Sequence, residues 1–263
     1  MIDNPRSPRV RAVAKLAKRN ARAETGLFLA EGPQSVAEAL AFHPETVVEF
    51  YATRSALDRY AALAQAAADA GVLIESVSDH VLDVMSDTVT PQGVIAVCRQ
   101  FPVSIEQLLD GAPRLIAILE EVRDPGNAGT IIRAADAAGA DGVILTGRSV
   151  DAYNPKVVRS TTGSIFHLPV AQGVELDVAV AVVKAAGIQV LAADIKGDDL
   201  PAVRETLNVP TAWLFGNEAH GLTDQSLALA DRVVRVPIYG RAESMNLATA
   251  ASVCLYESAF AQH

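Results

Sequence analysis

The sequence predicts an α/β protein of two domains, because strands and helices alternate with short connections along nearly the whole chain. The segment Phe101–Pro113 interrupts this alternation with two prolines, a short polar stretch and at most one helical turn, and it is the best candidate for a domain boundary. The apolar run Leu115–Glu121 then opens a second block and is typical of a buried parallel strand. We therefore expect domains over residues 1–100 and 114–263, joined by a linker over 101–113.

The first block begins with a basic helix and continues as alternating strands and helices. Pro33 precedes one of these helices and Gly71 ends another, in the positions where each residue type is common. The expected helices are 8–22, 34–42, 55–70 and 79–86, and the expected strands are Leu27–Ala30, Thr46–Tyr51, Val72–Val77 and Gly93–Arg99.

The second block has the same alternation, with a long helix at its end. Gly139 marks the end of its first helix. The expected helices are 128–138, part of 154–166, 176–186 and Met245–Ala261, and the expected strands are Leu115–Glu121, Gly142–Thr146, Ile188–Ala193, Thr211–Phe215 and Val233–Val236.

Composition restricts the class of protein. The chain has 263 residues, of which 50% are hydrophobic and 20% charged, a balance typical of a globular protein. Only two cysteines are present, Cys98 and Cys254, which excludes a disulfide scaffold and favours a reducing, cytoplasmic environment. No long uncharged apolar run predicts a membrane span, and no His/Cys cluster predicts a metal site.

The charge is unevenly distributed. The net charge is −9, yet residues 1–24 carry a balance of +5 and the remaining residues a balance of −14. A basic segment on an acidic body is typical of local phosphate contact, although a solvated surface helix is the more common reason for such a segment. Charge alone leaves both interpretations open.

Three loops that follow predicted strands combine polar residues with glycines. They are residues 121–129, 215–221 and 237–246. In open α/β sheets, ligands bind at the carboxyl ends of the strands. None of these loops has the GxGxxG or GxxxxGK[ST] pattern, which argues against a dinucleotide-binding or P-loop enzyme. The loops favour a compact ligand that is held mainly by backbone groups.

These loops resemble the three motifs of the SpoU family of RNA 2′-O-ribose methyltransferases. Residues 124–133 (DPGNAGTIIR) resemble the first motif, and residues 214–222 (LFGNEAHGL) the second. The third is matched by residues 236–238 (VPI) together with residues 244–248 (SMNLA). The first block resembles the accessory, L30e-like domain of this family through residues 28–32 (FLAEG) and 90–94 (TPQGV).

The resemblance implies a SPOUT fold, in which a parallel sheet ends in a deep trefoil knot. It also implies S-adenosylmethionine as the methyl donor, an RNA substrate and a homodimer whose RNA site uses both subunits. Since the donor is activated by its own sulfonium charge, no metal is needed. An accessory domain of a ribosomal-protein type favours ribosomal RNA over transfer RNA.

The resemblance assigns roles to individual residues. The implied catalytic residues are Arg133, Asn127, Glu218, Ser244 and Asn246. The implied cofactor-binding residues are Thr146, Leu214, Gly216, Asn217, Ile238, Met245 and Leu247. Arg159 is expected near the RNA, and the basic residues expected to bind RNA phosphates are Arg9, Arg11, Lys15, Lys18 and Arg19.

Each role has a structural alternative. Asn127 suits the N-cap of the following helix, and one of Ser244 and Asn246 suits the N-cap of the last helix. Arg133 could pair with Asp136 on one helix face. Gly216 is expected to let the cofactor approach the backbone, so that a larger residue there would weaken binding and leave the fold intact.

Two other functions remain open at this point. One is a noncatalytic RNA-binding protein that keeps the scaffold, and the other is an enzyme of the same fold that methylates a base nitrogen. The complete set of implied catalytic residues argues against the first, and Arg133 with Ser244-Met245-Asn246 argues against the second. The sequence specifies neither the RNA nor the nucleotide that is modified.

Overall fold

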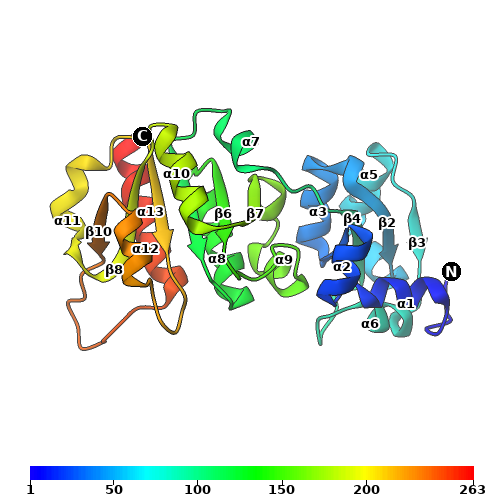
Figure 1. Ribbon diagram of the computed structural model, residues 1–263. Helices are drawn as coiled ribbons and strands as arrows, with labels where there is room; N and C mark the ends of the chain where they lie inside the picture. Colours follow the sequence, from blue (N-terminus) through cyan, green and yellow to red (C-terminus); the bar gives the residue numbers. More distant parts are fainter. The chain divides into compact units, whose positions relative to one another are not determined.

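The computed structural model describes residues 1–263, whose contacts divide into two compact units (Figure 1). One unit comprises Met1–Phe101 with Tyr153–His167, and the other comprises Pro102–Ala152 with Leu168–His263. The short segment Tyr153–His167 joins the first unit because apolar side chains such as Tyr153 and Phe166 pack into its core. Its position in the sequence gives no sign of this packing.

The first unit is built on a small mixed sheet with the strand order β1-β4-β2-β3. Neighbouring strands are antiparallel, except that β2 and β3 run parallel. Its strands are β1 (Leu27–Glu31), β2 (Val47–Ala52), β3 (Ile74–Ser76) and β4 (Val94–Arg99). Its α-helices are α1 (Pro8–Lys15), α2 (Arg19–Thr25), α3 (Pro33–Phe42), α4 (Arg54–Arg59), α5 (Ala61–Asp69), α6 (Asp79–Met85) and α9 (Pro155–Thr161), and its 3-10 turns are η1 (Pro44–Thr46) and η2 (Ser164–Phe166).

The helix expected over residues 8–22 is broken into α1 and α2. The guanidinium of Arg22, which is 1% exposed, donates hydrogen bonds to the carbonyl oxygens of Leu16 and Ala17, both at 2.9 Å. These bonds satisfy the carbonyls at the break and replace the backbone bonds of a continuous helix. The expected helix over 55–70 is likewise divided, at Tyr60.

The second unit is built on a six-stranded parallel sheet with the order β10-β8-β9-β5-β6-β7. Its strands are β5 (Leu115–Glu120), β6 (Gly142–Thr146), β7 (Val170–Val174), β8 (Gln189–Asp199), β9 (Thr211–Phe215) and β10 (Arg232–Arg235). Its helices are α7 (Ile105–Leu109), α8 (Pro125–Ala137), α10 (Leu176–Ala185), α11 (Leu200–Val203), η3 (Arg204–Thr206), α12 (Asp224–Leu229) and α13 (Leu247–Gln262).

This architecture confirms the predicted α/β class and the parallel sheet of the second block. The central strands β5, β6 and β9 are buried almost throughout, as expected for strands covered on both faces. Several elements were not expected: the strand β7, the helices α11 and α12, and the 3-10 turns η1 and η3. The trefoil knot and the L30e-like character of the first unit stay predictions.

The edge of the sheet at β8 and β10 has an irregular pairing. Val233 pairs with Ala192, but the next residue, Val234, pairs with Asp198, so residues 193–197 of β8 leave the ladder. A Cβ atom on Gly197 would lie 2.4 Å from the carbonyl carbon of Val233, so only glycine allows β10 to lie this close. The residues that leave the ladder are free to line a cavity.

Candidate functional site

The candidate site lies where three neighbouring strands end. β5 leads into residues 121–124, β9 into residues 216–222, and β10 into residues 236–246. In the strand order β10-β8-β9-β5 these parallel strands are close neighbours, so their carboxyl ends meet at one edge of the sheet. The three loops singled out from the sequence are thus brought together by the fold.

The first loop is shaped by the start of α8. Asp124 is the N-cap of this helix, and its Oδ1 accepts a hydrogen bond from the backbone N–H of Asn127 at 2.8 Å. The capping interpretation of Asn127 is therefore wrong. Because Asp124 occupies the cap, the side chain of Asn127 is free to make contacts with the other loops.

Asn127 connects the second and third loops. Its Nδ2 donates to Oε1 of Glu218 at 3.4 Å, and its Oδ1 accepts from Nδ2 of Asn246 at 3.0 Å. Asn246 is itself the N-cap of α13, where its Oδ1 accepts from the backbone N–H groups of Ala248 and Thr249. The expectation that Ser244 or Asn246 caps this helix is thus confirmed for Asn246.

Glu218 fastens the second loop to the first. Its two carboxylate oxygens accept hydrogen bonds from the backbone N–H groups of Arg123, at 3.2 Å, and Asp124, at 3.0 Å. The Asn217 side chain adds a second link, since its Nδ2 donates to the carbonyl oxygen of Glu121 at 2.7 Å. Glu218, Asn127 and Asn246 form a continuous hydrogen-bonded chain across the three loops, which we call the three-loop network.

Glu121, for which the sequence suggests no role, is the first residue of the first loop. Its backbone has φ of 51°, a conformation that L residues rarely adopt. Its carboxylate accepts from the guanidinium groups of Arg123, at 2.5 Å, and Arg148, at 3.1 Å. These hydrogen bonds hold the pKa of Glu121 below its ordinary value. No pattern in the sequence predicts a positive φ at this residue.

Two of the expected catalytic residues stand outside the three-loop network. Arg133 lies on α8, six residues beyond Asn127, which places it about 9 Å along the helix axis and about 120° around it. Its side chain is exposed, and none of the hydrogen bonds or ion pairs of the site involves it. Ser244 is exposed in the third loop and lines the neighbouring cavity.

That cavity opens beside β8 and β10, and we call it the β8–β10 cavity. It has two adjoining parts of about 110 Å³ and 410 Å³, which share Ile195, Arg235, Val236 and Ile238. The inner part also includes Met245 and Ser244, and the outer part Tyr239 and Glu243. Apolar walls with a few polar groups at the rim are typical of small-molecule sites.

The remaining residues expected to bind a cofactor lie elsewhere or serve the fold. Thr146 is fully buried on β6, where its hydroxyl bonds to Glu120 and to the carbonyl oxygen of Leu119. Leu214 is also fully buried, and Asn217 and Leu247 are partly exposed next to the three-loop network. The structure thus gathers Ile238 and Met245 at the β8–β10 cavity and does not bring Thr146 there.

Gly216 is required by the turn of the protein chain itself. A Cβ atom at this position would lie 2.6 Å from the carbonyl carbon of Gly221 and 2.7 Å from the nitrogen of Leu222. These are backbone atoms, which cannot move aside without disturbing the loop. The expectation that a larger residue at Gly216 leaves the fold intact is therefore wrong.

The basic residues of the first unit differ in their surroundings. Arg9 is occupied by Glu49 and Glu75, at 3.2 and 3.1 Å, and lies over the ring of Tyr51. The others are exposed and form no ion pair within the chain, and we call them the N-terminal basic group: Arg11, Lys15, Lys18 and Arg19. Arg159 forms ion pairs with Glu31, at 3.1 Å, and Asp87, at 2.9 Å.

Sequence comparison identifies relatives over the whole chain. Residues 114–256 match the family described as the SpoU rRNA Methylase family, and residues 29–103 match the family described as RNA 2′-O ribose methyltransferase substrate binding. A Bacillus subtilis protein named 23S rRNA (guanosine(2553)-2′-O)-methyltransferase RlmP is 34% identical, over 97% of this chain and 97% of its own length.

Solved structures are similar over nearly the same extent. An AdoMet-bound rRNA methyltransferase from Sinorhizobium meliloti is 31% identical, covers 98% of this chain and 96% of its own, and superimposes with a TM-score of 0.82. The SpoU methyltransferase AviRb from Streptomyces viridochromogenes, in complex with AdoMet, is 29% identical, covers 97% and 98%, and gives a TM-score of 0.83.

Two classes of feature are not found in the structure. None of the helices is both long and apolar enough to span a membrane. No group of three or more His, Cys, Asp or Glu side chains is arranged to hold a metal ion. The two cysteines are free and buried, and burial raises the pKa of each thiol to about 12, as expected for residues that pack in the core.

Proposed function

Because the chain belongs to the SpoU family and is an RNA 2′-O-ribose methyltransferase, we propose that it methylates ribosomal RNA with S-adenosylmethionine as the donor. The observation that carries this proposal is the three-loop network, which joins Glu218, Asn127 and Asn246 next to the β8–β10 cavity. The network holds polar side chains in fixed positions, as the alignment of two reacting groups requires.

The β8–β10 cavity fits the proposed donor. Its apolar walls, with Ile195, Ile238 and Met245, suit an adenosyl group, and the carboxylate of Glu243 suits the cationic part of the molecule, whereas Asp199 is paired with Arg235. The donor supplies an electrophilic methyl group on a positively charged sulfur. The protein then has to position the ribose hydroxyl and to favour the loss of its proton.

Arg133 is the proposed group for this second task. A guanidinium has a pKa above about 12, so it stays protonated and is a poor base. It can instead stabilise the 2′-oxygen electrostatically as negative charge develops there, and its planar fork suits an adjacent phosphate. The three loops are held together by the hydrogen bonds of Asn127, Glu218 and Asn246. Ser244 adds a hydroxyl group at the inner part of the β8–β10 cavity.

We further propose that the active unit is a homodimer. Arg133 lies apart from the three-loop network of its own chain, so a partner subunit is the natural source of the guanidinium at each site. The long helix α13 is apolar in composition and exposes Tyr256 and Phe260, at 37% and 68%. A helix that is apolar on all sides is typical of one that is buried on all sides.

The choice of ribosomal RNA is supported by the relatives and by the first unit. One relative of nearly the same length is named for 23S rRNA, and a substrate-binding family matches residues 29–103. The N-terminal basic group can bind phosphates without reading sequence. A ribosomal substrate also implies that the protein works in the cytoplasm. Transfer RNA is the alternative substrate.

Calorimetric titration with S-adenosylmethionine tests the donor site. We expect saturable binding of one donor per subunit, weakened by Ile238→Asp, which adds a charge to the cavity wall. Val89→Ala, a change at a 96%-exposed side chain of the first unit, is the matched control. If the folded protein does not bind the donor either alone or with ribosomal RNA present, the noncatalytic RNA-binding alternative is favoured and the proposal fails.

A further inference from the structure

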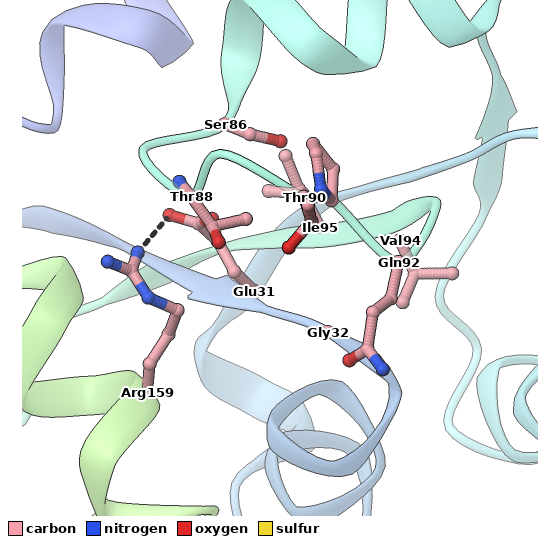
Figure 2. A pocket seen from close by; sticks show the side chains of 10 residues that line it. Glu31, Gly32, Ser86, Thr88, Thr90, Gln92, Val94, Ile95 and Arg159 are labelled. Carbon is pink, nitrogen blue, oxygen red and sulfur yellow. Dashed lines mark hydrogen bonds and ion pairs between the residues drawn. The ribbon is translucent and has the colours of Figure 1, made fainter.

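The first unit contains a cavity that no step of the proposed reaction uses. It has a volume of about 290 Å³ and lies between the end of β1, the start of α3, the loop over residues 86–93, and α9 (Figure 2). We call it the Glu31 cavity, and it is lined by Glu31, Gly32, Ser86, Thr88, Thr90, Pro91, Gln92, Val94, Ile95 and Arg159. It includes parts of residues 28–32 and 90–94, the two segments that stand out in the sequence of the first block.

The floor of this cavity is held together by the buried side chain of Glu31. Glu31 has a side chain only 3% exposed and accepts hydrogen bonds from the backbone N–H groups of Asp87, at 3.2 Å, and Thr88, at 3.3 Å. Arg159 completes the set with an ion pair at 3.1 Å, drawn in Figure 2. Because Glu31 ties the loop to the strand, the cavity walls keep their spacing without a ligand.

Gly32 contributes to the shape of the cavity. Its φ of 88° is strained for other residue types, and a Cβ atom there would lie 2.9 Å from Oε1 of Gln92. The absence of a side chain therefore leaves room for the Gln92 amide at the rim. The same glycine connects β1 directly to α3, so the position of this rim is fixed by two elements.

Several polar groups around the cavity have no partner within the chain. The hydroxyls of Thr88 and Thr90 and the amide of Gln92 take part in none of the hydrogen bonds of the structure, and Figure 2 shows their side chains around one opening. Hydroxyls and amides both donate and accept hydrogen bonds.

The charges at the cavity select the kind of ligand. Glu31 and Asp87 are both paired to the single cation Arg159, so the cluster has an excess of one negative charge. Such a cluster repels phosphate and suits a neutral group with donors and acceptors along its edge. A nucleobase has this chemistry, and its flat faces suit contact with the ring of Pro91 in the cavity lining.

The N-terminal basic group supplies the positive charge for phosphate binding that the Glu31 cavity lacks. Arg11 and Lys15 belong to α1, which packs against α6, and α6 leads through Met85 directly into the cavity loop. RNA whose phosphates contact α1 would therefore place nucleotides near the cavity. Bases in a duplex are not free to enter it, whereas unpaired bases are.

We propose that the Glu31 cavity binds the base of one unpaired nucleotide of the RNA substrate, with Thr88, Thr90 and Gln92 reading its edge. This inference rests on the proposed function, since it requires RNA as the substrate. It adds a recognition site within the first unit, where sequence-independent phosphate contacts alone would not choose a nucleotide.

The test measures the binding of fluorescein-labelled RNAs to the full chain at low salt by fluorescence anisotropy. The probes are short single strands rich in A, C, G or U, and a duplex of the same length. The double variant Thr90→Val/Gln92→Leu removes the edge-reading groups with little change in volume. Gln65→Leu is the matched control, because Gln65 is an exposed glutamine of the first unit that contacts only Asp69.

We expect the wild type to prefer one single strand over the duplex. The cavity variant should bind that strand about tenfold more weakly and bind the duplex unchanged. Lys15→Gln/Lys18→Gln should instead weaken all probes alike and reduce the dependence on salt. A thermal melt of each variant establishes that it is folded.

Two results would overturn the inference, and they differ in what they leave standing. If the cavity variant keeps the wild-type preference while the lysine variant loses affinity, RNA binding stands and the nucleotide site fails. If the wild type binds none of the RNAs and no ribosomal RNA, while it still binds S-adenosylmethionine, the RNA substrate itself is in error and the cavity proposal fails with it.

Discussion

Asn246 performs two tasks that a pair of substitutions can separate. Its Oδ1 caps α13 through the N–H groups of Ala248 and Thr249, at 2.9 and 3.2 Å, while its Nδ2 donates to Asn127 at 3.0 Å. Aspartate is as good an N-cap as asparagine, but it has no donor to offer Asn127. Asn246→Asp should therefore keep the helix cap and break the three-loop network, whereas Asn246→Ala removes both.

The magnitudes follow from these contacts. Loss of the cap in Asn246→Ala should cost about 1 kcal/mol of unfolding free energy, or roughly 3 °C in Tm for a domain of this size. Asn246→Asp should change stability by less than about 0.5 kcal/mol. A carboxylate at position 246 has no hydrogen to donate to the Asn127 oxygen, so the three-loop network is lost and kcat should fall at least about tenfold.

The assays are thermal unfolding and transfer of a labelled methyl group to ribosomal RNA. Thr249→Ala, which keeps both hydrogen bonds of the cap, is the matched control. An Asp variant with wild-type activity would refute the claim that the link between Asn127 and Asn246 matters for the reaction. An Asp variant as unstable as the Ala variant would refute the assignment of the cap.

Four further predictions can be checked in the same assays. Arg133→Ala should abolish most of the activity and leave Tm unchanged, since the side chain is exposed. A fall in Tm would contradict a purely functional role. Near-full activity of Arg133→Lys would show that a point charge suffices and that the planar guanidinium is not required. In the wild type, the buried Trp213 Nε1–H donates to the Ser258 hydroxyl oxygen at 2.8 Å. Ser258→Ala removes this acceptor and should lower the free energy of unfolding by about 1–3 kcal/mol. An unchanged Tm would be inconsistent with this hydrogen bond. Gly216→Ala should lower Tm whether or not the donor is present, as its Cβ would meet the backbone of Gly221; a loss of donor affinity at constant Tm would argue against this reasoning. Burial raises the pKa of Glu31 in spite of Arg159, so the stability of the wild type relative to Glu31→Gln should be greatest below the unfolded-state pKa and should decline as pH rises through the folded-state pKa. Urea unfolding of both proteins between about pH 4 and pH 7 measures this difference in stability. A difference that grows with pH would contradict the raised pKa.

The sequence predicted those parts of the fold that depend on local pattern. The strands Gly142–Thr146 and Thr211–Phe215 begin and end at the expected residues, because each is an apolar run with turn residues beside it. β7 was missed because Val170–Val174 contains a glycine and is only partly buried. The break between α1 and α2 could not be predicted, since it depends on where the guanidinium of Arg22 folds back.

The sequence predicted which residues belong to the candidate site better than it predicted how they are arranged. The motifs identified Asn127, Glu218 and Asn246, which the structure joins by hydrogen bonds. Sequence spacing could not show that Asp124 takes the cap, nor that Thr146 is separated from β8 by two other strands. These facts depend on side-chain direction and strand order, which a linear pattern does not contain.

The Glu31 cavity could not be predicted from the sequence either. Residues 28–32 and 90–94 stood out as separate segments, and Arg159 lies far from both in the chain. The antiparallel pairing of β1 with β4 and the ion pair of Arg159 with Glu31 bring all three together. Contacts between residues so distant in sequence follow only from the folded chain.

The measurement that tests the central claim most directly is the chemical position of the transferred methyl group. Ribosomal RNA is incubated with the protein and labelled S-adenosylmethionine, digested to nucleosides, and analysed by mass spectrometry. We expect a single 2′-O-methylated nucleoside, at a site that resists alkaline cleavage, and little product with Arg133→Ala. A methyl group on a base, or transfer that is independent of Arg133 and Asn127, would contradict it.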